Sequence, residues 1–84
     1  MSESQNVEYK SSWRDEYLKW ICGFANSSGG SIFIGKDDAG KVVGLAGSKK
    51  LLDDIPNKVR DTLGILVDAN LHRTANGDFI EIVC

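Results

Sequence analysis

The chain has 84 residues, of which 10 are Lys or Arg and 12 are Asp or Glu, giving a formal net charge of −2. A chain of this length has room for one domain with one core, and it buries only about 60–65% of its unfolded surface. The acidic balance excludes nucleic-acid binding by bulk charge, so any such binding must come from a local patch. No signal-peptide pattern and no apolar run of about 18 residues is present, which predicts a cytoplasmic protein without a membrane span. Cys22 and Cys84 stand alone, which favours reduced thiols over a disulfide or a zinc site.

The first predicted element is a short strand over residues 6–10, where polar and apolar side chains alternate. Val7 and Tyr9 fall on one face, and Glu8 and Lys10 fall on the other. This pattern is typical of a half-buried strand.

An amphipathic helix of about thirteen residues is predicted next, with Ser11 and Ser12 as capping residues. Its apolar side chains recur at helical spacing: Trp13, Tyr17, Trp20, Ile21 and Phe24. An aromatic stripe at this spacing is more typical of a core than of a base-stacking surface. The helix is expected to end between Asn26 and Gly30, because Asn and Gly adopt the left-handed conformation that ends helices.

A central strand is predicted over 31–34, because its residues are apolar on both faces. The turn over 37–40 then leads to Val42 and Val43, which are expected to pair back as a further strand.

The second predicted helix has an apolar stripe and ends at Gly64. Pro56 is tolerated if Asp53 caps the helix and Pro56 lies in its first turn, after a short turn from Ser48. A strand within 65–74, a turn through Asn76 and Gly77, and a return strand over 79–83 complete the chain. The elements predict an α/β (α+β) fold, a two-layer sandwich in which a mixed sheet of about five strands packs against two helices. Because residues 1–84 form a single domain that stops inside a strand, we expect an N-terminal fragment of a longer protein.

One near-match to a phosphate-binding loop is rejected. Residues 30–36 fit G-x-x-x-x-G-K, but the four middle residues are strand formers and Asp37 replaces the hydroxyl that would hold magnesium. Nucleotide binding through this segment is therefore not expected.

Three segments share a pattern with a known family. They read E-S-Q-N-V-E-Y-K over 3–10, F-A-N-S-S-G-G over 24–30, and I-G-K-D-D over 34–38. In order and spacing they resemble the Schlafen-type AlbA-like domain, along nearly the whole chain, with departures at Gly23 and Lys36. The resemblance implies the N-terminal part of a bacterial protein of the kind described as a transcriptional regulator or a divergent ATPase.

The resemblance also implies an acidic trio for metal-dependent RNA cleavage, which falls on Glu3, Glu8 and Asp38. Such carboxylates suit magnesium or manganese, which take oxygen ligands and leave sites for phosphate and water. Glu8 and Lys10 share a strand face, whereas Glu3 reaches that face only if the chain bends. The alternative is structural: the glutamates are solvated or paired with Lys10, Arg14 or Lys41, and the aspartates are ordinary turn residues.

Nucleic-acid binding has simpler requirements than metal-dependent cleavage, because phosphate contacts need only cations and exposed N–H groups. The candidate residues are Lys10, Arg14, Asn26, Gly29, Gly30, Lys36 and Lys41. The alternative is that these cations only make the surface soluble. His72 is expected to lie on the sheet surface rather than to act as a base.

Three functions follow from these residues and the resemblance. The first is a module that binds DNA or RNA at the N-terminus of a transcriptional regulator. The second is an RNA endonuclease that depends on magnesium or manganese. The third is an oligomerisation or nucleotide-sensing module, for which a homodimer is expected.

Overall fold

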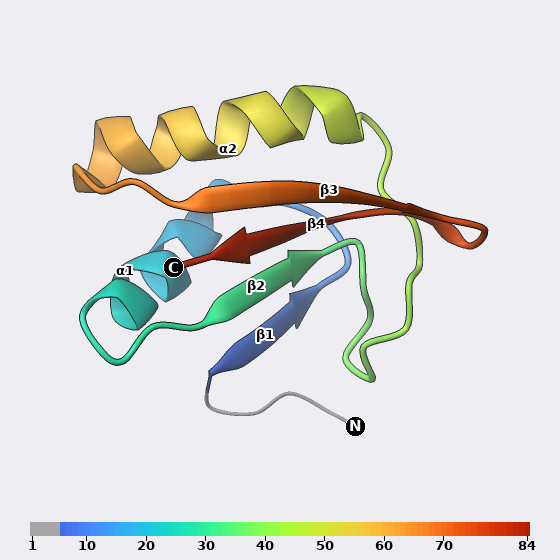
Figure 1. Ribbon diagram of the computed structural model, residues 1–84, viewed down its shortest axis with the longest axis horizontal. Coiled ribbons are helices and arrows are strands. Elements are labelled where there is room, and N and C mark those ends of the chain that lie inside the picture. The colour runs from blue at the N-terminus through green and yellow to red at the C-terminus, as the bar shows by residue number, and fades with distance from the viewer. Residues whose placement is uncertain (1–5) are drawn as a thin grey trace.

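The computed structural model describes residues 6–84 of the chain (Figure 1). Its elements, in chain order, are β1 (Val7–Lys10), the 3-10 helix η1 (Asp15–Tyr17), α1 (Leu18–Ala25), β2 (Ser31–Ile34), α2 (Ser48–Leu63), β3 (Asp68–Thr74) and β4 (Gly77–Val83). None of the helices in this part of the chain is long and apolar enough to cross a bilayer.

The strands form one mixed sheet in the order β1-β2-β4-β3. β1 and β2 are parallel, whereas β4 pairs antiparallel with both β2 and β3. Figure 1 shows β4 between β2 and β3, so the last strand of the chain lies inside the sheet. The predicted α/β sandwich and the central position of residues 31–34 are confirmed. The expected strand at Val42 and Val43 is reduced to a single bridge between Lys36 and Val42, which leaves four strands in the described residues.

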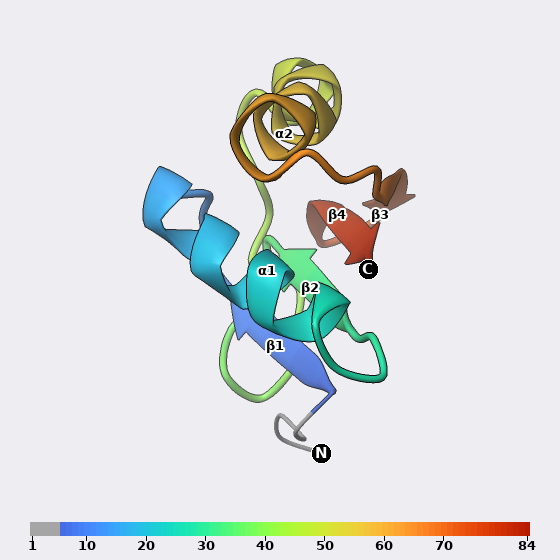
Figure 2. The same ribbon diagram turned by 90° about the vertical axis from the view of Figure 1, so that its left-hand side faces the viewer.

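Both helices cover the same face of the sheet, as Figure 2 shows. The core between these two layers consists of Ile21, Phe24, Ile32, Ile34, Ile55, Val59, Ile80 and Ile82. Six of these eight are isoleucines, four of them on β2 and β4, where β-branched side chains suit the pleated backbone. Within residues 6–84, no helix lies on the opposite face of the sheet, which we call the uncovered face.

Strand β1 turns its charged face toward the helices. The parallel register pairs Glu8 with Ile32 and Tyr9 with Phe33, and paired residues point to the same face. Glu8 is therefore buried, with 9% of its surface exposed, and Tyr9 lies on the uncovered face. The sequence separated the two faces of this strand correctly but did not fix which face the helices cover.

The first helix begins later than predicted. Arg14 is extended (φ −138°, ψ 142°), and the helical turns start at Asp15 without a side-chain cap from Ser11 or Ser12. The helix ends at Ala25, one residue before the predicted range, with Asn26 as its C-cap, and Gly29 has a φ of +95°. Of the predicted apolar stripe, Ile21 and Phe24 are buried, whereas Trp20 is 37% exposed.

Helix α2 is one continuous helix through Pro56, which corrects the predicted interruption. Proline removes one backbone hydrogen bond from a helix interior. Ile55 and Val59 on either side of Pro56 are fully buried, and this packing holds the helix together across the missing bond. Gly64 ends it in the left-handed conformation (φ 71°), as predicted.

The two cysteines are free thiols, as expected. Burial raises the pKa of the Cys84 thiol above its ordinary value.

An exposed ion pair joins η1 to α2. Lys58 Nζ lies 2.8 and 3.0 Å from the two carboxylate oxygens of Asp15, and the Trp13 indole N–H donates to Asp15 Oδ1 at 2.9 Å. The hydrogen bond from Lys58 lowers the pKa of the Asp15 carboxyl below its ordinary value, and the hydrogen bond from Trp13 contributes a smaller lowering.

This lowered pKa predicts a pH-dependent contribution to stability. A carboxylate whose pKa is lower in the folded state stabilises the fold above its unfolded pKa, and this stabilisation is lost as the pH falls through the folded pKa. We expect Lys58→Gln to lower the melting temperature slightly at neutral pH and to have no effect once Asp15 is protonated. Thermal melts of both proteins across the acid range test this, and a constant difference at every pH would contradict it.

Candidate nucleic-acid interface

The carboxyl ends of β1 and β2 meet at one edge of the sheet. The backbone N–H groups of Gly35 and Lys36 donate to the carbonyl oxygen of Lys10, at 2.7 and 3.2 Å. The backbones of Lys10 and Lys36 are therefore adjacent, but their side chains leave the sheet on opposite faces. Lys10 pairs with Ile34 on the helix face, whereas Lys36 Nζ lies over the rings of the uncovered face.

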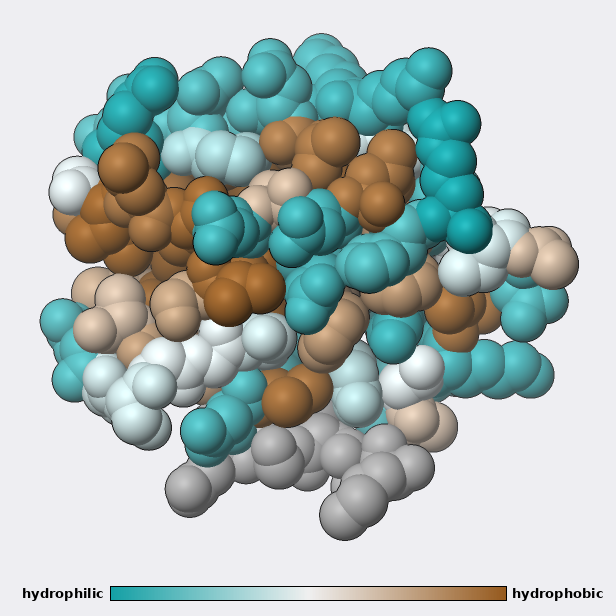
Figure 3. All heavy atoms as spheres, viewed as in Figure 1, coloured by the Kyte–Doolittle hydropathy of each residue, from teal (hydrophilic) through white to brown (hydrophobic). Residues whose placement is uncertain are grey.

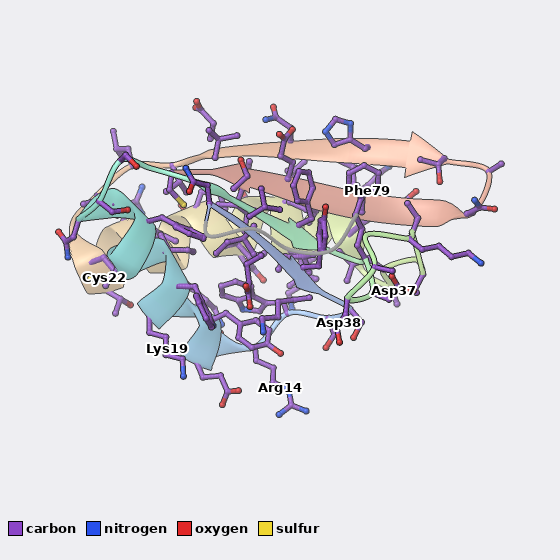
Figure 4. All side chains as sticks on the ribbon, turned by 90° about the horizontal axis from the view of Figure 1, so that it is seen from below. Arg14, Lys19, Cys22, Asp37, Asp38 and Phe79 are labelled. Atoms are coloured by element: carbon purple, nitrogen blue, oxygen red, sulfur yellow. The ribbon has the colours of Figure 1, made fainter. Side chains whose placement is uncertain are left out.

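A tight turn follows at the same edge and brings Lys41 back toward Lys36. Asp37 Oδ1 accepts the N–H groups of Ala39 and Lys41 at 3.0 and 2.9 Å. Asp37 therefore acts as a turn residue, as the structural alternative predicted. Asp38 is exposed beside it, and Figure 4 shows both aspartates close together in this loop.

Glu8 and Lys10 form an ion pair on the helix face of β1. Lys10 Nζ lies 3.1 Å from Glu8 Oε2, and their side chains are 23% and 12% exposed. The same ammonium lies over the rings of Tyr17 and Trp20, at 4.9 and 5.4 Å from their centroids. Lys10 thus connects β1 to the first helical segment, since both the carboxylate and the rings attract its charge.

The predicted metal site is only partly within the described chain, because Glu3 lies outside it. Across residues 6–84, no group of three His, Cys, Asp or Glu side chains converges in a way that could hold a metal ion. Of the two predicted ligands that are described, Glu8 is paired with Lys10, and Asp38 is exposed in the turn after β2. The described residues do not supply a complete ligand set, so metal-dependent cleavage stays a prediction from the resemblance.

Three further predicted residues lie at the other end of β2. Gly29 N–H donates to the Phe24 carbonyl at 3.0 Å, and a Cβ atom on Gly30 would lie 2.7 Å from the Asn6 carbonyl oxygen. Gly30 and Lys36 are separated by about 20 Å at the usual strand rise of about 3.3 Å per residue. Asn26 caps α1 at this same end. The predicted patch is therefore divided between the two ends of β2.

Arg14 stands apart from both groups. It precedes η1 and is exposed, and Figure 4 shows its side chain pointing away from the sheet on the helix side.

A row of rings on the uncovered face was not found from the sequence. Tyr9, Phe33, Phe79 and His72 come one from each strand, in the order of the sheet. Successive ring centroids lie 5.7, 6.2 and 4.7 Å apart. Part of the signal was present, because Phe33 lies between the core residues Ile32 and Ile34 and Phe79 precedes the core residue Ile80. The row appears only once the strand order is known.

Two hollows lie away from this row. One, of about 550 Å³, runs along α1 beside Lys19, Trp20 and Gly23, and the other, of about 330 Å³, lies beside Leu66 and Cys84. Leu66 is 85% exposed, and in Figure 3 hydrophobic surface gathers below the hydrophilic outer side of α2. Both hollows are mainly apolar and neither contains the predicted site residues at the carboxyl edge.

Comparison with known families bears directly on these segments. The family described as Schlafen, AlbA_2 matches residues 3–84, which include all the described strands and helices. The chain belongs to the Schlafen AlbA_2 family. This confirms the resemblance and supports, for an AlbA_2 domain, a nucleic-acid-related role. No curated protein matches this AlbA_2 chain at a significant level.

Proposed function

We propose that the chain is a nucleic-acid-binding module and forms the N-terminal part of a transcriptional regulator. The observation that carries the proposal is the meeting of the loops after β1 and β2 at the Lys10 carbonyl. This meeting brings Lys10, Lys36 and Lys41 to one edge, within a family whose domains are nucleic-acid-related. The carboxyl ends of parallel strands are also where α/β folds commonly place their ligands.

The neighbouring acids cancel only part of this positive charge. Glu8 pairs with Lys10 and neutralises its charge, whereas Asp37 Oδ1 is held by two backbone N–H groups of its turn. Lys41 and Arg14 are exposed, so their charged groups can exchange bound water for phosphate oxygens without losing packing contacts within the protein. So few contacts give weak binding, and log K should fall with log salt by only about one unit for each phosphate contact.

Phosphate contacts predict a measurable change in the salt dependence of binding. We expect the double variant Arg14→Gln/Lys41→Gln to bind DNA or RNA about ten-fold more weakly at low salt. The slope of log K against log salt should fall by about 2, one for each lost contact. Fluorescence anisotropy over a salt series measures both quantities.

The matched control is Lys49→Gln/Lys50→Gln, which removes the same charge from exposed positions on α2. This control should leave the slope nearly unchanged. Equal losses in both double variants would show that only net charge matters, and no binding at about 50 mM salt would reject the proposal.

The same samples separate the two alternatives. Cleavage of folded RNA in manganese that disappears in Glu8→Gln would favour the nuclease that the resemblance implies. A concentration-dependent dimer with neither binding nor cleavage, seen by sedimentation velocity, would favour the oligomerisation module.

A further inference from the structure

The uncovered face of the sheet carries a continuous row of rings. Tyr9, Phe33, Phe79 and His72 extend across all four strands, and His72 and Phe79 are stacked with an interplanar angle of 12°. All four residues are half-buried, and Gly40 lies against the Tyr9 ring, where a Cβ atom would come within 3.0 Å of a ring carbon. Both helices lie on the other side of the sheet (Figures 2 and 4), and Figure 4 labels Phe79 on the side away from them.

A lysine lies over the middle of this row. Lys36 Nζ is 4.4 Å from the centroid of Phe33 and 4.3 Å from that of Phe79, with Tyr9 at 5.9 Å. The ammonium is attracted by the negative faces of the rings, which shows that these faces are accessible to a charged group. The long lysine side chain can turn from the rings to a phosphate without moving the backbone of the strand.

We propose that this row is a stacking platform for an unpaired strand of nucleic acid. The bases stack on Phe33 and Phe79, and Lys36 moves from the rings to the adjacent phosphate. The inference rests on the proposed function and names its substrate class, because only an unpaired strand can present base faces to a flat protein surface. Stacking tolerates any base, so binding is expected to be nearly independent of sequence.

The charges beside the row are of both signs, so a polyanion would be attracted at Lys36 and repelled at Glu81. Glu81 is a carboxylate on the same face, and its Oε1 lies 3.1 Å from His72 Nε2. Glu81 flanks the row at β4 and should repel phosphate there. Glu81→Gln is therefore expected to strengthen binding, whereas Lys36→Gln weakens it.

The test measures binding of a labelled oligouridine and of a labelled duplex to the 84-residue chain by fluorescence anisotropy. Phe79→Leu keeps an apolar side chain but removes the ring, and it should weaken single-strand binding about ten-fold. Phe33→Leu should act in the same direction. Neither variant should change duplex binding by a comparable factor. Leu66→Ala is the control for apolar truncation, and Lys50→Gln is the control for charge loss.

Folding is checked by thermal melts, and Lys36→Gln keeps the inference testable if a phenylalanine variant unfolds. Salt-dependent binding that is unaffected by Phe79→Leu, Phe33→Leu and Lys36→Gln would overturn the platform but leave the proposed function standing. No binding of any nucleic acid would overturn both. The leucine variants could instead lose a dimer and still bind the oligonucleotide. That result would assign this face to a second copy of the chain and would also overturn the platform.

Discussion

Ile80→Ala is expected to lower the free energy of unfolding by about 3–4 kcal/mol. Ile80 is fully buried in β4, where it pairs with Ile34 on one side and Leu71 on the other. The substitution removes three carbon atoms from a core that two thin layers enclose, so little neighbouring structure can move in to fill the cavity. In a domain this small, such a loss is a large part of the total stability.

Denaturation followed by circular dichroism measures this effect. Ile80→Val should cost only about 0.5–1.5 kcal/mol, because it removes a single methylene group. Leu66→Ala is the matched control, since Leu66 is 85% exposed and its truncation should change stability little. Similar losses for Ile80→Ala and Leu66→Ala would mean that the core does not lie between the helices and the sheet.

Gly30→Ala is expected to destabilise the fold by about 2 kcal/mol or more, as overpacking commonly does. A Cβ atom on Gly30 would lie 2.7 Å from both the Asn6 carbonyl oxygen and a ring carbon of Phe24. The Asn6 carbonyl accepts the N–H of Ser31 at 2.9 Å, so it cannot move away without breaking the start of the β1–β2 pair. Phe24 is part of the core and is equally constrained.

Gly23→Ala provides a control with the opposite sign. Gly23 lies inside α1, and a Cβ atom there would have no neighbouring atom within 4 Å. Alanine in a helix interior is favoured over glycine by about 0.8–1.0 kcal/mol, so Gly23→Ala should raise the melting temperature. If both variants destabilised the protein equally, the close approach at Gly30 would not be the cause.

The sequence predicted those elements whose signals are local. The strand at residues 31–34, the hairpin through Asn76, and the helix ends near Asn26 and Gly64 each depend on a few adjacent residues. The continuous helix through Pro56 was missed, because the burial of Ile55 and Val59 that outweighs the proline arises only in the folded protein.

The candidate site was harder to predict because it depends on strand order. The sequence grouped Lys36 with Gly29 and Gly30, although they lie at opposite ends of β2. It also could not align Tyr9, Phe33 and Phe79, since that requires β4 rather than β3 to lie beside β2. The pairing of Glu8 with Lys10 follows from the two-residue period of a strand, and this pairing was among the predicted alternatives.

The position of β4 between β2 and β3 has a consequence for synthesis on the ribosome. Ile34 pairs with Ile80, which is synthesised 46 residues later in the chain. Before residues 77–83 emerge, β1 and β2 have only each other, and a pair of short strands is not stable alone. The sheet of this domain therefore stays open until residues 77–83 have emerged, and folding then proceeds with long-range pairing as its slow step.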